Sequence, residues 1–136
     1  MIEYRNDAAF TVEQMIELYV DSTLGPRRPV EDRDRMAAMM RNANLTITAW
    51  DGQTLVGIAR SVTDWVYATY LSDLAVKKSS QRQGIGKELI RQTQAAAPQA
   101  LLILLSAPAA RAYYPHVGME QHPSAWILRP GERLKD

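Results

Sequence analysis

Apolar residues recur at helical spacing near the start of the chain. They occupy successive turns in the order Val12, Met15, Ile16, Tyr19, Val20 and Leu24. Thr11 precedes this stripe and Gln14 follows shortly after, a pair that matches a capping box at the start of a helix. Gly25 and Pro26 end the predicted helix. A second helix is predicted over residues 31–42, where core packing or an adaptable pocket wall would explain the methionines Met36, Met39 and Met40.

The middle of the chain alternates between apolar and polar positions, as half-buried strands do. After a short first strand at residues 2–5, this alternation predicts an antiparallel meander over residues 45–50, 53–63 and 69–76. Asp51 and Gly52 supply a hairpin turn. Gly57 indicates either a bulge or the close approach of another segment.

Residues 100–105 are apolar at every position, which predicts a central strand covered on both faces. A helix that ends near Ala97 joins this strand to the preceding one. Such a strand–helix–strand passage is right-handed and makes its two strands parallel. A short helix over residues 109–114 and closing strands at residues 117–119 and 125–128 complete the predicted order.

Length and composition indicate one ordinary globular domain over residues 1–136. A net charge of +1 gives no electrostatic reason to expect a nucleic-acid or membrane partner. The absence of cysteine excludes disulfides and thiolate metal sites, and His116 and His122 lack ligand spacing, so no metal site is predicted. The first residues do not form a signal peptide, and no apolar run approaches the ~20 residues of a membrane span. A cytoplasmic location is therefore expected.

The segment that is most informative about function runs from residue 73 to residue 87. A buried strand leads into a turn, after which Gly84 and Gly86 open a helix. Glycines let the backbone approach a bound group, and the free N–H groups of a first helical turn attract anions. Arg82 and Lys87 place positive charge where a helix start favours acids, which points to an anionic ligand such as a phosphate. The segment lacks the lysine of a nucleotide P-loop and the third glycine of the dinucleotide fingerprint.

Residues 81–86, Gln-Arg-Gln-Gly-Ile-Gly, resemble the Gln/Arg-x-x-Gly-x-Gly/Ala signature of the GNAT (Gcn5-related) N-acetyltransferases. The resemblance implies an α/β (α+β) domain with a mixed, mostly antiparallel sheet of six to seven strands and about four flanking helices. One parallel pair of strands would splay apart and admit the pantetheine arm of acetyl-coenzyme A, the implied cofactor and acyl donor. The cofactor-binding residues so implied are Leu74, Ala75, Val76, Gln81, Arg82, Gln83, Gly84, Ile85, Gly86, Lys87 and Tyr113.

Residues 110–119 resemble a second segment of the same family, Ala-x-x-Phe-Tyr-x-Lys-x-Gly-Phe. Tyr113 takes the aromatic packing position, and Tyr114 takes the place of the catalytic tyrosine. A tyrosine hydroxyl keeps its proton at neutral pH and could donate it to the departing thiolate. The alternative is that Tyr114 is a packed aromatic at a helix end. Three departures from the family pattern, at Ala107, His116 and Met119, leave acceptor specificity open.

The general base is less well defined by these residues, and Asp73 is the nearest candidate. Strict alternation would place Tyr70 and Ser72 on the same sheet face as Leu74, with Asp73 on the other. A bulge would turn Asp73 inward. Two alternatives are a structural, hydrogen-bonded carboxylate at Asp73 and a water held by Tyr70 and Ser72 that relays the proton.

The resemblance implies direct transfer of an acetyl group to a primary amine of a small molecule or protein. Arg28, in the basic loop after the first helix, is either solvated or lines the acceptor site, and the candidate substrate-binding residues are Arg28, Tyr70 and Ser72. The rival hypothesis is a non-catalytic acyl-coenzyme A binder, a sensor or an interaction protein that uses the same cleft. A homodimer with Trp126 in the contact is also compatible with the sequence.

Overall fold

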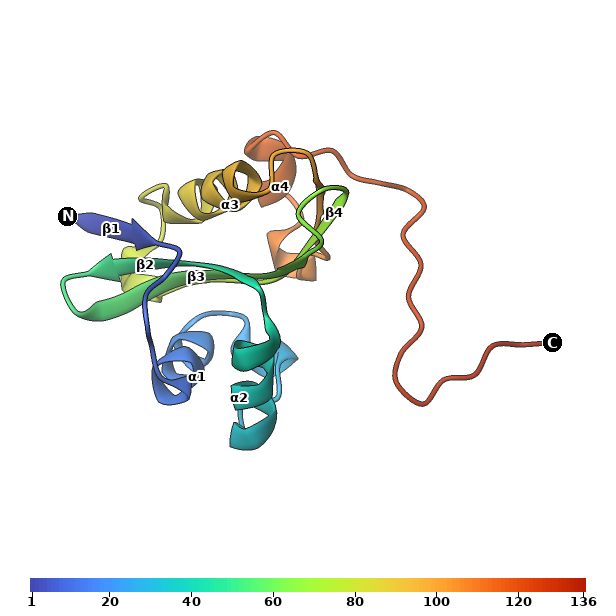
Figure 1. Ribbon diagram of the computed structural model, residues 1–136, viewed down its shortest axis with the longest axis horizontal. Coiled ribbons are helices and arrows are strands. Elements are labelled where there is room, and N and C mark those ends of the chain that lie inside the picture. The colour runs from blue at the N-terminus through green and yellow to red at the C-terminus, as the bar shows by residue number, and fades with distance from the viewer. The chain divides into compact units, whose positions relative to one another are not determined.

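The computed structural model describes residues 1–136 as two compact units, residues 1–105 and residues 106–136. The first unit is built on a five-stranded sheet with the order β1-β2-β3-β4-β5 (Figure 1). Its strands are β1 (Ile2–Arg5), β2 (Leu45–Asp51), β3 (Thr54–Thr63), β4 (Ala68–Val76) and β5 (Leu101–Ile103). The first four strands pair antiparallel, and β4 pairs with β5 in parallel. The expected mixed, mostly antiparallel sheet is confirmed.

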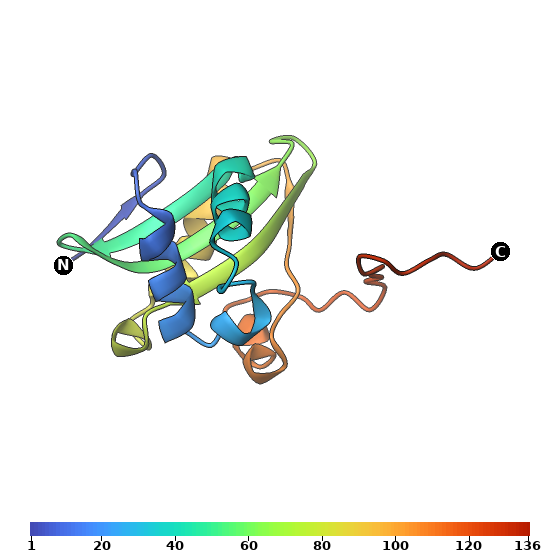
Figure 2. The same ribbon diagram turned by 90° about the horizontal axis from the view of Figure 1, so that it is seen from below.

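Three helices cover this sheet on both faces. Helices α1 (Val12–Asp21) and α2 (Arg33–Asn42) lie on one face and α3 (Ile85–Ala96) lies on the other (Figure 2). Short 3-10 turns, η1 (Gly25–Arg27) and η2 (Lys78–Ser80), follow α1 and β4. No helix of the chain has both the length and the apolar character required to cross a membrane.

Helix α1 begins as predicted but ends early. The Thr11 hydroxyl accepts the Gln14 N–H at 3.1 Å, and the Gln14 side chain accepts the Thr11 N–H at 2.8 Å, which completes the capping box. At the other end, the Ser22 hydroxyl donates to the Tyr19 carbonyl and accepts the Leu24 N–H. These local bonds compete with helical ones, so α1 ends at Asp21 and Leu24 packs from the loop. Val20 was expected on the buried stripe, but it is 59% exposed.

The two faces of the sheet carry two hydrophobic cores. The core under α1 and α2 includes Met15, Tyr19, Met36, Trp50 and Ile58. The core under α3 includes Ile47, Val56, Leu71, Ile85 and Leu89. At Gly57, a Cβ atom would lie 3.1 Å from side-chain carbons of both Ile85 and Leu89. Gly57 is therefore a close-approach position, because α3 packs directly on the backbone of β3. It also borders a bulge, since Ala49 pairs with Gly57 and Trp50 pairs with Leu55, which leaves Val56 as an extra residue of β3.

The sheet has five strands and not the six to seven that were expected. Residues 117–119 and 125–128 form no strand, and Trp126 is 91% exposed. The prediction of a central strand at residues 100–105 is also wrong, because β5 is an edge strand and its residue Leu101 is 65% exposed. An apolar run is compatible with either position, and only the presence of a flanking strand distinguishes them.

The second unit contains two short helical segments, η3 (Pro108–Ala110) and α4 (Tyr113–His116). Pro115 was expected to end a helix over residues 109–114, but it lies inside α4. A proline is tolerated there because the first N–H groups of a helix have no intrahelical acceptor. The expectation of one domain over residues 1–136 stays a prediction.

Candidate active site

Strands β4 and β5 separate after a short paired stretch. The pairs are Ala68–Leu101, Thr69–Leu102 and Tyr70–Ile103, and none follows. Residues 71–76 of β4 therefore have a strand partner only on the β3 side; we call this segment the open edge. The parallel splayed pair that the family resemblance implied is present.

The direction of the backbone along the open edge follows from one hydrogen bond. The Lys77 N–H donates to the Val56 carbonyl of β3 at 2.8 Å. Main-chain groups alternate in direction along a strand, so those of Leu74 and Val76 point away from β3. The Gln81 side-chain amide donates to the Val76 carbonyl at 3.0 Å, on that side. The open edge thus offers main-chain partners to an extended amide-bearing ligand.

The glycine turn, residues 81–87, follows the open edge. Gly84 is the N-cap residue of α3 with a φ of 81°, has no capping side chain, and would have nothing within 4 Å of an added Cβ atom. The N–H groups of Ile85, Gly86 and Lys87 precede the first intrahelical bond, which runs from the Glu88 N–H to the Gly84 carbonyl at 3.1 Å. Free N–H groups at the start of a helix, beside a glycine with open space at its Cβ position, suit a phosphate oxygen.

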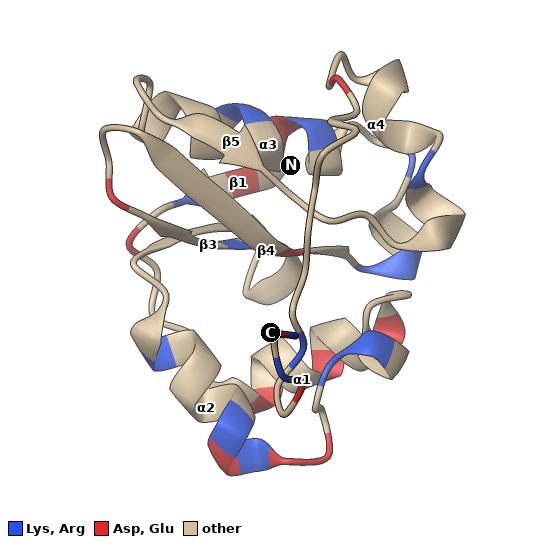
Figure 3. Ribbon diagram, turned by 90° about the vertical axis from the view of Figure 1, so that its right-hand side faces the viewer, with Lys and Arg blue, Asp and Glu red and all other residues tan.

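Charges around the glycine turn favour an anion. Arg82 and Lys87 are exposed on its rim and make no side-chain hydrogen bond or ion pair. Along α3, the acidic Glu88 lies between two basic residues (Figure 3) and pairs with one of them, Arg91. The Asp21 carboxylate accepts a hydrogen bond from the Lys78 N–H at 2.8 Å, which connects η2, just before the glycine turn, to α1. Arg82 has a φ of 64°, a strained backbone for a residue other than glycine.

A bulge in β4 sets the direction of Asp73. Ser61 pairs with Leu71 and Arg60 pairs with Asp73, so Ser72 is an extra residue on β4. Because of the bulge, Leu71 and Leu74 both join the core under α3, and Asp73 points to the α1 and α2 face, opposite Leu74. The expected bulge is present, but Asp73 stays on the face that strict alternation from Leu74 gives it, and its role as a base stays a prediction.

Asp73 is fully buried, and four side chains surround its carboxylate. It accepts hydrogen bonds from the Tyr19 hydroxyl at 2.6 Å, Arg28 Nε at 2.6 Å, Arg60 Nε at 2.5 Å and the Ser72 hydroxyl at 3.2 Å. We call these five residues the Asp73 cluster. Burial raises the pKa of Asp73, but the hydrogen bonds from Arg60 and Tyr19 and the charge of Arg60 outweigh it and lower the pKa. Burial and the adjacent carboxylate raise the pKa of Tyr19 well above its usual value. These contacts agree with the alternative in which Asp73 is a structural, hydrogen-bonded carboxylate and not a general base.

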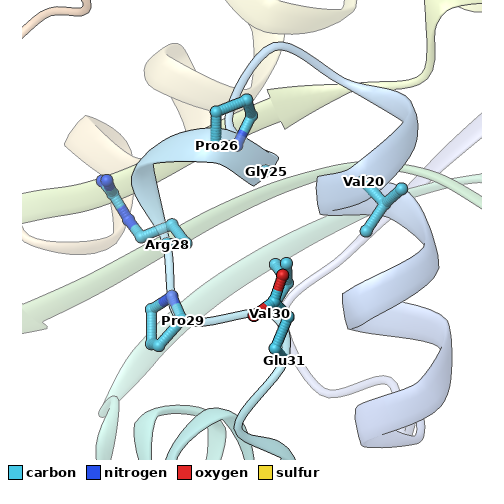
Figure 4. Close-up of a pocket in the computed structure, with 7 residues that line it drawn as sticks. All are labelled: Val20, Gly25, Pro26, Arg28, Pro29, Val30 and Glu31. Atoms are coloured by element: carbon cyan, nitrogen blue, oxygen red, sulfur yellow. The ribbon is translucent and has the colours of Figure 1, made fainter.

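Arg28 also lines an open pocket of about 630 Å³ beside α1. The other lining residues are Val20, Gly25, Pro26, Pro29, Val30 and Glu31 (Figure 4). The Arg28 side chain and Val20 lie on opposite sides of the view, and the Arg28 guanidinium reaches Asp73 and the Ser72 carbonyl of β4. Glu31 makes no ion pair or side-chain hydrogen bond. Glu31 is therefore the only charged side chain of the pocket lining that has no polar partner.

The predicted site residues lie in four places. The open edge and the glycine turn hold Leu74, Ala75, Val76 and residues 81–87, and the Asp73 cluster holds Arg28 and Ser72. Tyr70 pairs with Ile103 at the last position of the parallel ladder and is 41% exposed. Tyr113 and Tyr114 belong to the second unit, where their rings pack edge to face with centroids 5.3 Å apart. Partial burial raises the pKa of Tyr113.

The sequence analysis missed two members of the Asp73 cluster, Tyr19 and Arg60. Arg60 carried a signal, because it is the only charged residue in its strand and its burial requires a partner. Tyr19 carried no such signal, because the apolar stripe of the first helix predicts only that its side chain is buried, and not that its hydroxyl has a polar partner. Glu31 was also missed, and its role depends on a pocket that no local pattern reveals.

The sequence matches the family described as "Acetyltransferase (GNAT) family" over residues 12–119. The chain therefore belongs to the GNAT acetyltransferases. No curated protein matches the sequence.

Solved structures of low sequence identity share the fold. A GNAT family acetyltransferase from Streptococcus pneumoniae is 24% identical with a TM-score of 0.75, over 95% of this chain and 99% of that one. An aminoglycoside N-acetyltransferase in complex with a coenzyme A bisubstrate analogue is 15% identical with a TM-score of 0.72, over 95% and 97%. A protein described as a transcriptional regulator from Bacillus halodurans is 21% identical with a TM-score of 0.68, over 95% and 98%.

Proposed function

We propose that this protein is an acyltransferase that moves an acetyl group from acetyl-coenzyme A to a primary amine of a small molecule or a protein. The observation that carries the proposal is the separation of β4 from β5 beside the glycine turn. An anion-binding turn and an unpaired strand edge are adjacent in the chain, and together they suit a ligand with a diphosphate and an amide-bearing arm. Membership of the GNAT family supports the same function.

The residues of the first unit divide the binding of acetyl-coenzyme A between them. The N–H groups of Ile85, Gly86 and Lys87 would hold the diphosphate, with Arg82 adding positive charge. Main-chain groups of Leu74 and Val76 would hold the amide-bearing arm along the open edge. When bound, the cofactor supplies an acetyl group activated as a thioester. The Leu74 N–H could also stabilise negative charge that develops on the acyl oxygen.

We infer that Asp73 does not remove the proton from the incoming amine. Its carboxylate is fully buried and already accepts bonds from Arg28, Arg60 and Tyr19. A lowered pKa also makes it a poor proton acceptor. A water held by Tyr70 and Ser72 takes this role, and Tyr114 donates a proton to the departing thiolate.

The pocket beside α1 is the proposed acceptor site. Its lining is apolar apart from Arg28, which is bonded to Asp73, and Glu31, whose carboxylate has no partner. A protonated amine that pairs with a carboxylate is not nucleophilic, so Glu31 would bind the cation of an unreacted amine before transfer or a second basic group of the acceptor.

Release of free thiol tests the function directly, using acetyl-coenzyme A and a panel of primary amines. The Tyr114→Phe variant should bind coenzyme A with unchanged affinity and lose about 10²-fold in kcat. Tyr67→Phe, in the exposed β3–β4 hairpin, is the matched control and should retain full activity. Unchanged kcat in Tyr114→Phe would remove the proton-donor role from Tyr114.

A non-catalytic acyl-coenzyme A binder is the second candidate function. The structural similarity to a protein described as a transcriptional regulator is the observation in its favour. Thermal stabilisation by coenzyme A distinguishes the outcomes, because a sensor would be stabilised yet release no thiol with any amine.

A further inference from the structure

Arg28 connects the proposed acceptor pocket to the bulge in β4. It comes from the loop between α1 and α2 and lines the pocket there (Figure 4). Its Nε donates to Asp73 at 2.6 Å, and its Nη2 donates to the Ser72 carbonyl at 2.6 Å. A third bond, from its Nη1 to the Arg27 carbonyl at 2.8 Å, fixes the side chain to its own loop. One side chain thus joins the pocket loop to Ser72, the extra residue of the β4 bulge.

The charge of Arg28 is not required to neutralise Asp73. Arg60 lies directly opposite Asp73 in the β3–β4 register, bonds it at 2.5 Å and supplies one full positive charge. The Arg60 side chain is 9% exposed and the Arg28 side chain is 17% exposed, so the more buried partner already compensates the carboxylate. Arg28 is therefore a second cation on a single acid, and its presence needs another explanation.

The bond to the Ser72 carbonyl supplies that explanation. The extra residue of a bulge leaves the regular strand ladder, so its main-chain groups need other partners. Arg28 satisfies the Ser72 carbonyl with a charge-assisted bond, which is the stronger kind of hydrogen bond. The bulge directly precedes Leu74 and Val76, whose main-chain groups point toward the open edge.

We infer that Arg28 is a positioning residue for acetyl transfer, and not a ligand for the acceptor. It holds the β4 bulge in register, so that the Leu74 N–H is aligned for the acyl group. It also makes the alignment depend on the conformation of the acceptor-pocket loop. This inference rests on the proposed function, and it corrects the assignment of Arg28 to substrate binding.

Three variants test the inference: Arg28→Ala, Arg28→Lys and the control Arg27→Ala, an exposed arginine of the same loop whose side chain makes no hydrogen bond or ion pair. Arg28→Ala should lower kcat about 10- to 100-fold, with the KM of the amine within about twofold of wild type. Arg28→Lys should fold as stably as wild type because its ammonium can still reach Asp73. It should nevertheless fail to restore kcat, because one nitrogen cannot occupy both guanidinium positions.

A second measurement does not depend on activity. Amide resonances of residues 72–76 should shift in Arg28→Ala and Arg28→Lys, and they should stay in place in Arg27→Ala. If the wild type transfers acetyl to no amine, the proposed function fails, and these resonances decide by themselves whether Arg28 holds the bulge. A raised amine KM with unchanged kcat would overturn the inference and make Arg28 a substrate ligand. Unshifted resonances, or recovery of kcat in Arg28→Lys, would overturn it as well.

Discussion

Asp73 and the glycine turn lie close together in the sequence, but their polar groups are satisfied in opposite ways. In the cluster, every side chain that contacts Asp73 comes from within the protein, and the carboxylate is fully buried. In the glycine turn, the first N–H groups of α3 have no intrahelical acceptor, and Arg82 and Lys87 have no side-chain partner. The charged groups of the Asp73 cluster pair with one another and stabilise the fold. The positive groups of the glycine turn have no partner within the protein and are available to a ligand.

This contrast separates stability from function along one strand and the turn that follows it. A perturbed, buried carboxylate in a cleft is a common sign of a catalytic group, but structural ion pairs perturb pKa values in the same way. At Asp73 the number of partners decides between them, because a carboxylate already saturated by donors has little capacity to accept a further proton. The functional signal in this protein is instead the set of groups without partners.

The largest effect is expected from removing the charge at Asp73. Asp73→Asn leaves Arg28 and Arg60 without a counter-charge, so the free energy of unfolding should fall by about 3–5 kcal/mol. Urea unfolding measures this change, and Glu17→Gln on the exposed side of α1 should alter it by less than about 0.5 kcal/mol. A loss as small as that of the control would show that the cluster does not stabilise the fold.

The same carboxylate should produce an acid-dependent loss of stability. The pKa of Asp73 is lower in the folded protein than in the unfolded chain, where the reference value is about 3.9. Its contribution is therefore complete above the unfolded pKa and is lost as the pH falls through the folded pKa. Unfolding measured from pH 7 down to pH 2 should show a decline below about pH 4 in the wild type. A decline of equal size in Asp73→Asn would assign it to other acids.

Two glycines with similar backbones provide the next test. Gly84 and Gly52 both have positive φ angles, 81° and 60°, and neither has an atom within 4 Å of an added Cβ. Alanine at either position should therefore cost a similar free energy of unfolding, about 1–2 kcal/mol. Only Gly84→Ala should also reduce the thermal stabilisation by coenzyme A, since only Gly84 borders the proposed phosphate site. Equal stabilisation in the two variants would place the ligand elsewhere.

The smallest effect is expected at Arg82. Arg82→Gly relieves the positive φ and should raise the free energy of unfolding by less than about 1 kcal/mol. The same change removes an exposed charge and should weaken coenzyme A binding about two- to fivefold, with the difference shrinking at high salt. Arg82→Lys keeps the charge and the strain, so its affinity should stay near that of the wild type. Calorimetric titration at two salt concentrations measures both variants.

The sequence by itself determined the features that depend on neighbouring residues. The capping box of Thr11 and Gln14, the turn at Asp51 and Gly52 and the helix opening at Gly84 are local patterns, and the structure confirms all three. The fold class was implied by the resemblance of residues 81–86 and of the order of elements to the GNAT family, and the structure confirms a mixed sheet flanked by helices.

Only the tertiary structure decided which distant residues meet. The convergence of Tyr19, Arg28 and Arg60 on Asp73 depends on a bulge that inverts the alternation in β4. The edge position of β5 likewise depends on whether another strand lies beside it, which an apolar run cannot specify. Periodicity in a sequence determines which side of an element is apolar. Register and neighbours, which involve residues far apart in the chain, determine what each side chain contacts.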